Sequence, residues 1–512
     1  MYPGTYAAEA PERLAAVMAG TGDTLSYGDL ERRSAQLAHV LHEAGLRPGD
    51  VVALVTENNL RAMEVYWAAL RSGLYITAVN YRLKPDEVSY IVNDSGAVAL
   101  VISAHQAGTA TAIADQTPGV KLRLAFGGPI AGYGSYEDTI AAASATPFED
   151  QPHGATMLYS SGTTGRPKGV RPPLPPVQVS ELGEAVVGLA QGAFGIGRDS
   201  VYLSPGPIYH AAPLRFCGAV QALGGTVVMM PRFDAEQALA AIEKYHVTHA
   251  QFVPTMFVRM LQLPPEVRAK YDVSSLRVAI HAAAPCPVEV KQKMIEWWGP
   301  VLFEYYAGTE SNGMTIIDSA TWLNKPGTVG KPVLGPVRIC AEDGTELPAG
   351  QAGTVYFEAE RVPFTYHNDP DKTKASQHPA HPAWTTLGDI GYLDEDGFLF
   401  LTDRRAFTII SGGVNIYPQE TENVLALHPA VYDVAVIGVP DPEMGESVTA
   451  FIAPAPGAVP GPELEQEIIA FVKSKIASFK APRSVHFVTE LPRSEAGKLM
   501  KGVLKAQYAQ QP

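Results

Sequence analysis

The segment that runs from Tyr159 to Gly169 concentrates residue types that bind anions: three glycines, two serines, two threonines and two cations. Glycine lets the backbone approach a ligand closely, and successive N–H groups in such a turn form a concave nest for an anion. The hydroxyl groups add donors, and Arg166 and Lys168 add positive charge. The segment therefore predicts a polyphosphate-binding loop, although its composition alone would also suit a flexible linker.

The order of residues in this loop differs from that of a Walker A motif. A Walker A loop ends in Gly-Lys followed by Ser or Thr, whereas here Lys168 precedes Gly169 and Val170 follows. The sequence thus argues against a P-loop NTPase and keeps the phosphate interpretation.

Five later segments place small or charged residues where they could complete a nucleotide site. Glu310 offers a hard oxygen ligand of the kind Mg²⁺ prefers, and Asp389 could accept both hydroxyls of a vicinal diol. Lys498 is a mobile cation on a long stem. Taken alone, Glu310 would also suit a surface acid, Asp389 a turn residue and Lys498 a solvated cation. The segments are Ala282–Pro285, Tyr305–Glu310, Thr386–Gly391, Ser411–Pro418 and Leu491–Lys498.

In this order, the six segments resemble the motifs of the adenylate-forming enzymes. This superfamily comprises acyl-CoA synthetases, adenylation domains of nonribosomal peptide synthetases and firefly-type luciferases. The resemblance covers nearly the whole chain and is greatest to bacterial fatty or aryl acid–CoA ligases.

The resemblance implies a role for residues in each segment. Catalysis is expected from His210, Thr309, Glu310 and Lys498, with Mg²⁺ held by Glu310. His210 could gate the path between acid and thiol, or could be a structural histidine. Nucleotide contacts are expected from Ser160, Ser161, Gly162, Thr163, Thr164, Gly165, Lys168, Ala283, Ala284, Pro285, Tyr305, Tyr306, Asp389 and Arg404.

The same resemblance implies two further regions. Gly412 and Gly413 are expected to line a tunnel for the pantetheine arm of CoA. The acyl pocket is expected to be formed by Tyr209, Phe216, Val253, Met256, His281 and Gly308, and its aromatic content favours a medium-chain or aromatic acid.

The implied reaction uses ATP, Mg²⁺ and CoA. A carboxylic acid attacks ATP to give an acyl-adenylate and pyrophosphate, and the acyl group then passes to the CoA thiol. An amine acceptor, as in an amide-bond synthetase, or oxygen, as in luciferase, is the alternative. A non-catalytic nucleotide sensor is disfavoured because Glu310, Asp389, Arg404 and Lys498 are all present.

Three departures from the family pattern are visible. Alanines at 282–284 replace the usual glycines, which narrows the space between adenine and acid. Ala406 and Phe407 occupy the region of the usual hinge residue. Arg171 and two prolines follow the phosphate loop, where a histidine is common.

The helices and strands predicted to position these residues indicate an α/β fold. A buried strand is predicted at 51–55, which is a short apolar run, and further strands are predicted at 76–79, 98–102 and 225–230. Helices are predicted from Tyr27 to His42, over 62–72, after the capping residue Asp234 and over 462–475. Strands alternating with helices indicate parallel sheets covered by helices. The segments 249–255 and 278–285 are each predicted to pass from a strand into a loop.

The chain is expected to form two domains. Residues 1–403 form the large N-terminal AMP-binding domain, built from parallel α/β sheets plus a small β-barrel-like subdomain after about Lys331, where Asp-Gly turns separate short strands. Residues 404–512 form a small mobile α+β C-terminal lid, with a hinge near 404–407.

Composition excludes several classes of protein. The 512 residues carry a net charge of −14 with no long basic run, so nucleic acid is not an expected partner. No apolar run is long enough to span a membrane. Three scattered cysteines (Cys217, Cys286 and Cys340) fit a protein of the reducing cytoplasm. The identity of the acid, and whether the chain forms a homodimer, are left open by the sequence.

Overall fold

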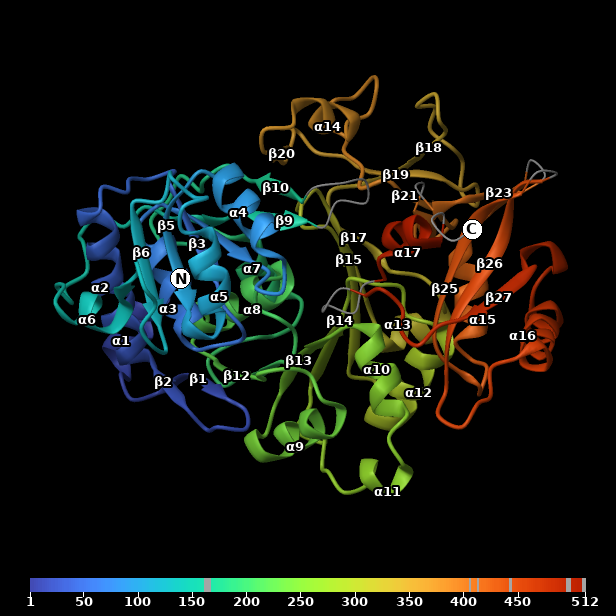
Figure 1. The fold of residues 1–512 in the computed structure, drawn as a ribbon, viewed down its shortest axis with the longest axis horizontal. Coiled ribbons are helices and arrows are strands. Elements are labelled where there is room, and N and C mark those ends of the chain that lie inside the picture. The colour runs from blue at the N-terminus through green and yellow to red at the C-terminus, as the bar shows by residue number, and fades with distance from the viewer. Residues whose placement is uncertain (161–166, 405–406, 412–413, 442–443, 494–498, 509–512) are drawn as a thin grey trace.

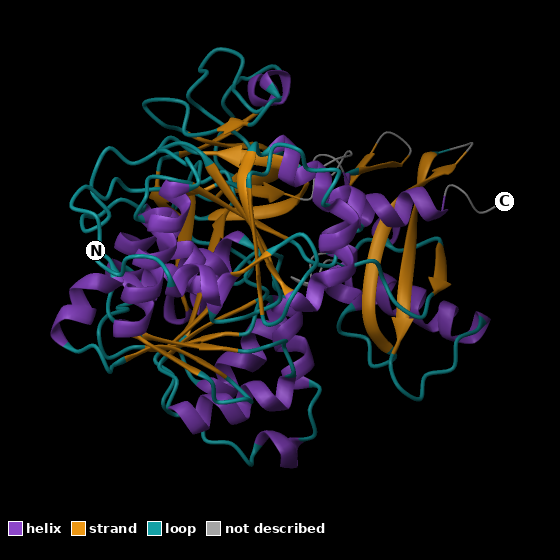
Figure 2. Ribbon diagram, turned by 60° about the vertical axis from the view of Figure 1, so that its left-hand side comes forward, coloured by secondary structure: helices purple, strands orange, loops and turns teal. Residues whose placement is uncertain are grey.

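The computed structural model describes residues 1–160, 167–404, 407–411, 414–441, 444–493 and 499–508. Within these ranges the chain forms two large sheets, two small antiparallel sheets and a C-terminal sheet. The N-terminal segments lie at the left of Figure 1 and the C-terminal sheet lies at the right. Figure 2 shows helices between the C-terminal sheet and the remaining sheets.

A six-stranded parallel sheet forms the first layer, with strand order β7-β6-β5-β3-β4-β8. Its strands are β3 (Val51–Val55), β4 (Tyr75–Val79), β5 (Ala97–Ser103), β6 (Leu122–Phe126), β7 (Gly134–Ser135) and β8 (Ala155–Thr156). All five residues of β3 are buried, as a strand covered on both faces requires. Val52 and Leu54 belong to the core shared with the second sheet, and Val51, Ala53 and Val55 belong to a separate core on the other face.

The helices around this sheet come from the first half of the chain. Helix α2 (Tyr27–Glu43) begins where the hydroxyl of Ser26 accepts the backbone N–H of Asp29. The others are α1 (Pro3–Glu9), α3 (Arg61–Leu70), α4 (Pro85–Asp94), α5 (Ala107–Ile113) and α6 (Tyr136–Ala141).

A nine-stranded sheet forms the second layer, with order β17-β16-β15-β14-β13-β11-β12-β1-β2. The strands from β15 to β1 are parallel, and β16, β17 and β2 are antiparallel additions at the two edges. The strands are β1 (Leu14–Met18), β2 (Thr24–Ser26), β11 (Val201–Ser204), β12 (Thr226–Met229), β13 (His249–Phe252), β14 (Val278–His281), β15 (Leu302–Ala307), β16 (Met314–Asp318) and β17 (Lys331–Leu334).

The two faces of the nine-stranded sheet are covered differently. Tyr202, Val227 and Ile280 face the core that includes α8 (Ala211–Ala222) and α3, which therefore lie between the two large sheets. Leu203, Val228 and Ala279 face the opposite core. Helices on that side are α9 (Ala235–Tyr245), α10 (Pro254–Leu261) and α12 (Val288–Trp298), and the remaining helices of this region are α7 (Ala185–Gly192), α11 (Pro265–Arg268) and α13 (Ser319–Asn324).

Three smaller sheets complete the fold. An antiparallel sheet joins β9 (Leu158–Ser160), β10 (Lys168–Arg171) and β20 (Thr365–Tyr366), with α14 (Pro370–Ala375) after β20 at the top of Figure 1. A second antiparallel sheet contains β18 (Val337–Cys340), β19 (Gly353–Phe357), β21 (Asp389–Leu393) and β22 (Leu399–Arg404).

The C-terminal sheet has its own core. Its strands are β23 (Ile409–Ser411), β24 (Val414–Ile416), β25 (Val431–Asp441), β26 (Gly445–Pro454) and β27 (Ser484–Phe487), and its helices are α15 (Pro418–Leu425), α16 (Pro462–Lys475) and α17 (Lys501–Tyr508). Ile409, Val436 and Ile468 are fully buried within this core. The division of the chain at residue 404 stays a prediction: β22 ends at Arg404 in one sheet, and β23 begins the next at Ile409.

The predicted fold class is confirmed. The chain is an α/β protein with large parallel sheets, and the β-rich region predicted after Lys331 is the four-stranded sheet that contains β18, β19, β21 and β22. One local prediction is wrong: the loop expected after β13 is short, and α10 begins at Pro254. Proline is well suited to the first helical position, because the N–H it lacks would have no partner there.

Candidate active site

A cavity of about 1120 Å³ opens where several parallel strands of the nine-stranded sheet end. Strands β11, β13, β14 and β15 are neighbours, so the segments that follow them meet at one edge. Ligands of open α/β sheets bind at such carboxyl edges. The predicted residues that line the cavity are Lys168, Tyr209, His210, Phe216, Val253, Met256, Ala283, Ala284, Pro285, Tyr305, Tyr306, Gly308, Thr309, Glu310 and Asp389.

Asp389 is held rigidly at the cavity wall. It begins β21, is 5% exposed, and one of its carboxylate oxygens (Oδ2) accepts the phenol O–H of Tyr306 at 2.6 Å. Its backbone pairs with that of Arg404 across the β21–β22 ladder. An oriented carboxylate of this kind is suited to bind the two hydroxyls of a ribose.

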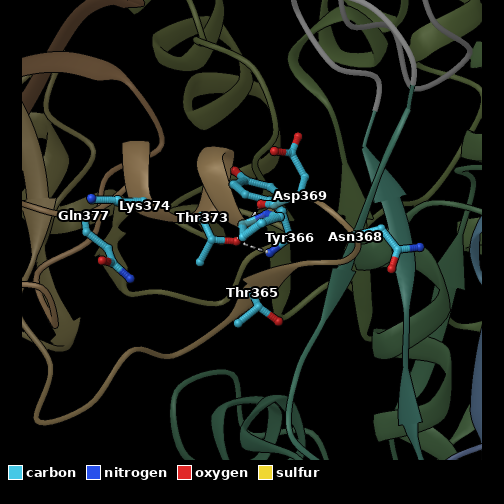
Figure 3. Close-up of a pocket in the computed structure, with 8 residues that line it drawn as sticks. Thr365, Tyr366, Asn368, Asp369, Thr373, Lys374 and Gln377 are labelled. Carbon is cyan, nitrogen blue, oxygen red and sulfur yellow. Dashed lines mark hydrogen bonds between the residues drawn. The ribbon is translucent and has the colours of Figure 1, made fainter.

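Glu310 is oriented by a residue that the sequence did not reveal. Its Oε1 accepts the phenol O–H of Tyr366 at 2.8 Å, and Tyr366 is 8% exposed. The backbone N–H of Tyr366 donates in turn to the hydroxyl of Thr373 on α14, which Figure 3 shows as a dashed line. The carboxylate therefore faces the cavity with one oxygen already fixed.

The donor set around Glu310 fits Mg²⁺ that arrives with a polyphosphate. No group of three or more His, Cys, Asp or Glu side chains suited to a metal occurs among the residues that the structure describes. Mg²⁺ commonly takes one or two carboxylates and completes its shell with phosphate oxygens and water. A lone, oriented carboxylate beside a phosphate-binding loop meets that requirement.

Lys168, at the end of the phosphate loop, lies beside Asp369, an acid from the same segment as Tyr366. Its Nζ is 3.5 Å from Oδ2 of Asp369, whose other oxygen (Oδ1) caps α14 by accepting the backbone N–H of Lys372. Asp369 and Tyr366 lie close together in Figure 3. One short segment, residues 365–373, thus contacts both the loop cation and the candidate metal ligand.

The loop after β14 carries backbone strain. Ala283 has a φ of +72°, in the left-handed region that favours glycine, and its side chain is exposed at the cavity. Non-glycine residues in such conformations cluster at functional sites. The structure thus explains why the family usually has glycine in this loop.

An aromatic and polar wall borders the expected acyl region. The ring of Phe216 stacks between Tyr202 and Tyr305, with centroids 6.2 Å and 6.1 Å away. Gln251 bridges the two phenols: its amide donates to Tyr305 Oη at 2.8 Å, and its carbonyl oxygen accepts from Tyr202 Oη at 3.1 Å. Burial raises the pKa of Tyr305 to about 12, so this phenol stays protonated at neutral pH.

His281 does not line the cavity as described, so the structure gives no support to its expected place in the acyl pocket. Side chains alternate along β14, so His281 points away from α8 and packs against Phe257 of α10, with ring centroids 5.4 Å apart. It is completely buried and absent from the described cavity lining. Its ring nitrogens have no hydrogen-bond partner among the described side chains, and Glu304 Oε2 lies 3.8 Å away.

A buried ion pair lies beside His281. Lys291 of α12 donates to Glu304 Oε2 at 2.6 Å, and its ammonium lies 4.7 Å from the centre of the Trp322 ring. Burial raises the pKa of Glu304, and Lys291 partly offsets that rise. Burial, with a smaller contribution from Lys291, holds the pKa of His281 well below its ordinary value, so this imidazole is neutral.

The C-terminal part closes one side of the cavity. Arg493, Leu499, Met500 and Lys501 line it, so both flanks of the predicted lysine motif are at the site. Arg493 is fixed by a two-pronged ion pair with Asp433, each contact 2.6 Å long. Lys501 pairs with Glu422 at 2.9 Å.

Several predicted residues lie outside what the structure describes. These are Ser161, Gly162, Thr163, Thr164, Gly165, Gly412, Gly413 and Lys498, together with the side chains of Ser160 and Arg404. Of the hairpin that carries the two glycines, no described residue lines the cavity.

No helix in the described parts of the chain combines the length and apolar character needed to cross a bilayer.

Similarity to known proteins extends over nearly the whole chain. Residues 5–366 match the AMP-binding enzyme family, and residues 420–498 match the AMP-binding enzyme C-terminal domain. A feruloyl-CoA synthase from an Amycolatopsis species is 33% identical, with 95% of this chain and 94% of the relative covered.

Solved structures are similar to the same extent. ATP-bound MatB from Rhodopseudomonas palustris is 29% identical with a TM-score of 0.82, covering 100% of this chain and 99% of its own. The amide bond synthetase McbA from Marinactinospora thermotolerans is 28% identical with a TM-score of 0.83, covering 99% of both chains.

Proposed function

This chain belongs to the AMP-binding enzyme family, and on that basis we propose that it uses ATP to convert a carboxylic acid into an acyl-adenylate and then transfers the acyl group to the thiol of CoA. The family resemblance inferred from the motifs is thereby confirmed, and the relatives include CoA ligases. The observation that carries the proposal is one cavity lined by Asp389, Glu310, the 283–285 loop and both flanks of the Lys498 motif.

In the first half-reaction, a carboxylate oxygen of the acid attacks the α-phosphorus of ATP and the bond to pyrophosphate breaks. The chain's contribution is to position the reactants and to balance their charge. Asp389 would hold the ribose, the 283–285 loop would pack against adenine, and Lys168 with the rest of its loop would hold the leaving pyrophosphate. Lys498 would bridge the acid and the α-phosphate.

Mg²⁺ bound with ATP would neutralise charge on the phosphates, and Glu310 is the residue we assign to hold it. Tyr366 would keep the Glu310 carboxylate pointed into the cavity, because it already donates to one of its oxygens.

In the second half-reaction, the CoA sulfur attacks the acyl carbonyl and AMP leaves. The described hairpin residues do not line the cavity, whereas the Lys498 flanks do. This arrangement suits the first half-reaction. We assign Gly412 and Gly413 to the second, after rotation of the C-terminal part about residues 404–407.

The similarity to McbA favours one alternative, in which an amine takes the acyl group from the same adenylate. Hydroxamate formation and acid-dependent exchange of labelled pyrophosphate into ATP, measured across a panel of acids, test the first half-reaction. Product identification with CoA or with an amine then separates the two acceptors. Absence of exchange with every acid would reject the proposed function.

A further inference from the structure

Arg215 is a cation that lines the cavity and is held there by two hydroxyl groups. It lies on α8 next to Phe216 and lines the cavity. Its Nε donates to the hydroxyl of Thr156 at 2.8 Å, and its Nη1 donates to the hydroxyl of Ser311 at 3.1 Å. Both partners are neutral. Within the described ranges, no carboxylate lies within ion-pair distance of this guanidinium, and its Nη2 has no hydrogen-bond partner.

The chain has a net charge of −14, so acidic side chains that could neutralise a cation are plentiful in it. Two half-buried arginines near the large sheets are neutralised: Arg33 pairs with Glu64 and Glu137, and Arg71 pairs with Glu31. The hydroxyl groups of Thr156 and Ser311 hold the Arg215 guanidinium in one orientation without neutralising its positive charge. A fixed guanidinium with free N–H groups matches the geometry of a carboxylate, which it can bind through two parallel hydrogen bonds.

Some neighbours of Arg215 belong to the expected acyl region. Phe216, the next residue of α8, stacks between Tyr202 and Tyr305 in the aromatic wall. The Arg215 charge offsets part of the burial-driven rise in the pKa of Tyr305, which agrees with a position near that phenol. The cation therefore lies between this wall and the residues beside the phosphate loop and Glu310, to which Thr156 and Ser311 belong.

We propose that Arg215 binds a second carboxylate of the acid substrate, so that the preferred substrates are dicarboxylic acids with a flat or alkyl spacer. One carboxylate is activated by ATP, and the other is held by the guanidinium of Arg215. This inference rests on the proposed adenylate-forming function.

The experiment compares acids in pairs that differ only in the second carboxylate: hexanedioate with hexanoate, benzene-1,4-dicarboxylate with 4-methylbenzoate, and 4-carboxycinnamate with 4-methylcinnamate. Acid-dependent pyrophosphate exchange gives kcat/KM for each. The wild-type protein is expected to prefer the dicarboxylic member of at least one pair by tenfold or more, because a charge-assisted hydrogen bond contributes about that factor or more.

Arg215→Met is expected to lower the ratio of kcat/KM for the dicarboxylic acid to that for its partner by about 30-fold, mainly through KM for the acid. Arg215→Lys keeps the positive charge but loses the planar guanidinium, so its kcat/KM ratio should lie between those of Arg215→Met and the wild type. Arg32→Met makes the same chemical change at an exposed ion pair with Asp29, and should leave the ratio as it is in the wild type.

Two results overturn the inference. One is a wild-type protein that activates monocarboxylic acids as well as or better than their dicarboxylic partners. The other is an Arg215→Met variant that loses activity equally for both members, or whose KM for ATP rises instead, which would assign the guanidinium to the phosphates or to folding. Lack of exchange with every acid rejects the proposed function itself, which is a different result from exchange with monocarboxylic acids alone.

Discussion

The hydrogen bond from Tyr366 to Glu310 joins residues that are 56 positions apart. Partners that orient a metal-binding carboxylate commonly change metal affinity by 10- to 100-fold when they are removed. On the proposed function, Tyr366 therefore acts as a positioning residue for the Mg²⁺ that accompanies ATP.

Tyr366→Phe is expected to raise the Mg²⁺ concentration needed for half-maximal pyrophosphate exchange by about tenfold, with a smaller effect on KM for the acid. Tyr133→Phe is the matched control, because that phenol donates to the backbone carbonyl of Ala110 away from the cavity. An unchanged Mg²⁺ requirement, or a fall in activity that excess Mg²⁺ cannot restore, would contradict the role given to Tyr366.

His281 predicts a pH dependence of stability. Its pKa is lowered in the folded protein by burial and by Lys291, so it stays neutral when the unfolded chain takes up a proton. A group whose pKa is depressed on folding contributes stability above its unfolded pKa of about 6.5 and loses that contribution as the pH falls. The loss at pH 5.5 amounts to about 1.4 kcal/mol.

His281→Asn should therefore reduce the fall in unfolding free energy between pH 7.5 and 5.5 by about 1.4 kcal/mol, as measured by urea denaturation. Glu304 and Lys291 lie beside residue 281 in both proteins. Their contributions to the pH dependence therefore largely cancel when the variant is compared with the wild type. The exposed His105, changed to Asn, is the control. Parallel pH profiles for wild type and His281→Asn would show that this imidazole is not held neutral.

At the scale of elements, the loop after β14 shows what sequence patterns can and cannot predict. The pattern of 278–285 predicts a strand that passes into a loop, as the structure has it. The positive φ of Ala283 could not be predicted, since alanine avoids that conformation.

Ala283→Gly relieves the backbone strain but makes the unfolded chain more flexible, and the two effects nearly balance. We expect a change in unfolding free energy between zero and about 0.5 kcal/mol in favour of the variant. Ala284→Gly, at a residue without positive φ, should destabilise by about 0.5–1 kcal/mol. Equal destabilisation by both substitutions in urea unfolding would argue against strain at Ala283.

Regular elements were the part of the fold that local pattern predicted best. The helix from Asp234 is α9, and the predicted 462–475 helix is α16. Contacts made by the strap of residues 365–373 were missed because they join segments separated by long stretches of chain. The start of α14 at Asp369-Pro370 was the one local signal, since it marks a helix beginning but not its partners.

The position of His281 could not be predicted for a related reason. Family position suggested the acyl pocket, but alternation along β14 determines which face a side chain takes, and that face is set by the register of the sheet. The uncompensated charge of Arg215 was likewise invisible, because a lone arginine in a helix carries no pattern. The order of motifs, by contrast, was sufficient to indicate one shared site.

For the whole molecule, the placement of the C-terminal part leads to a prediction about the two half-reactions. Lys498→Ala should reduce acid-dependent pyrophosphate exchange by at least 100-fold, yet leave the reaction of supplied acyl-adenylate with CoA within a few-fold of wild type. Loss of both reactions to the same extent would mean that the lysine does not act in one half-reaction alone.

Gly413→Leu should have the opposite effect, because a bulky side chain would block the thiol path but not the nucleotide. Pyrophosphate exchange should stay near wild type while CoA-dependent turnover falls by at least tenfold. CoA turnover equal to wild type would remove Gly413 from the thiol path.

The backbone pairing of Asp389 with Arg404 across β21 and β22 fixes the last residue of β22 beside the residue that we assign to the ribose. On the proposed mechanism, the pivot is therefore anchored to the nucleotide rather than to either moving partner. The acyl-adenylate can then stay bound while the C-terminal part rotates above it. This intermediate is easily hydrolysed, and it need not be released into water between the two half-reactions.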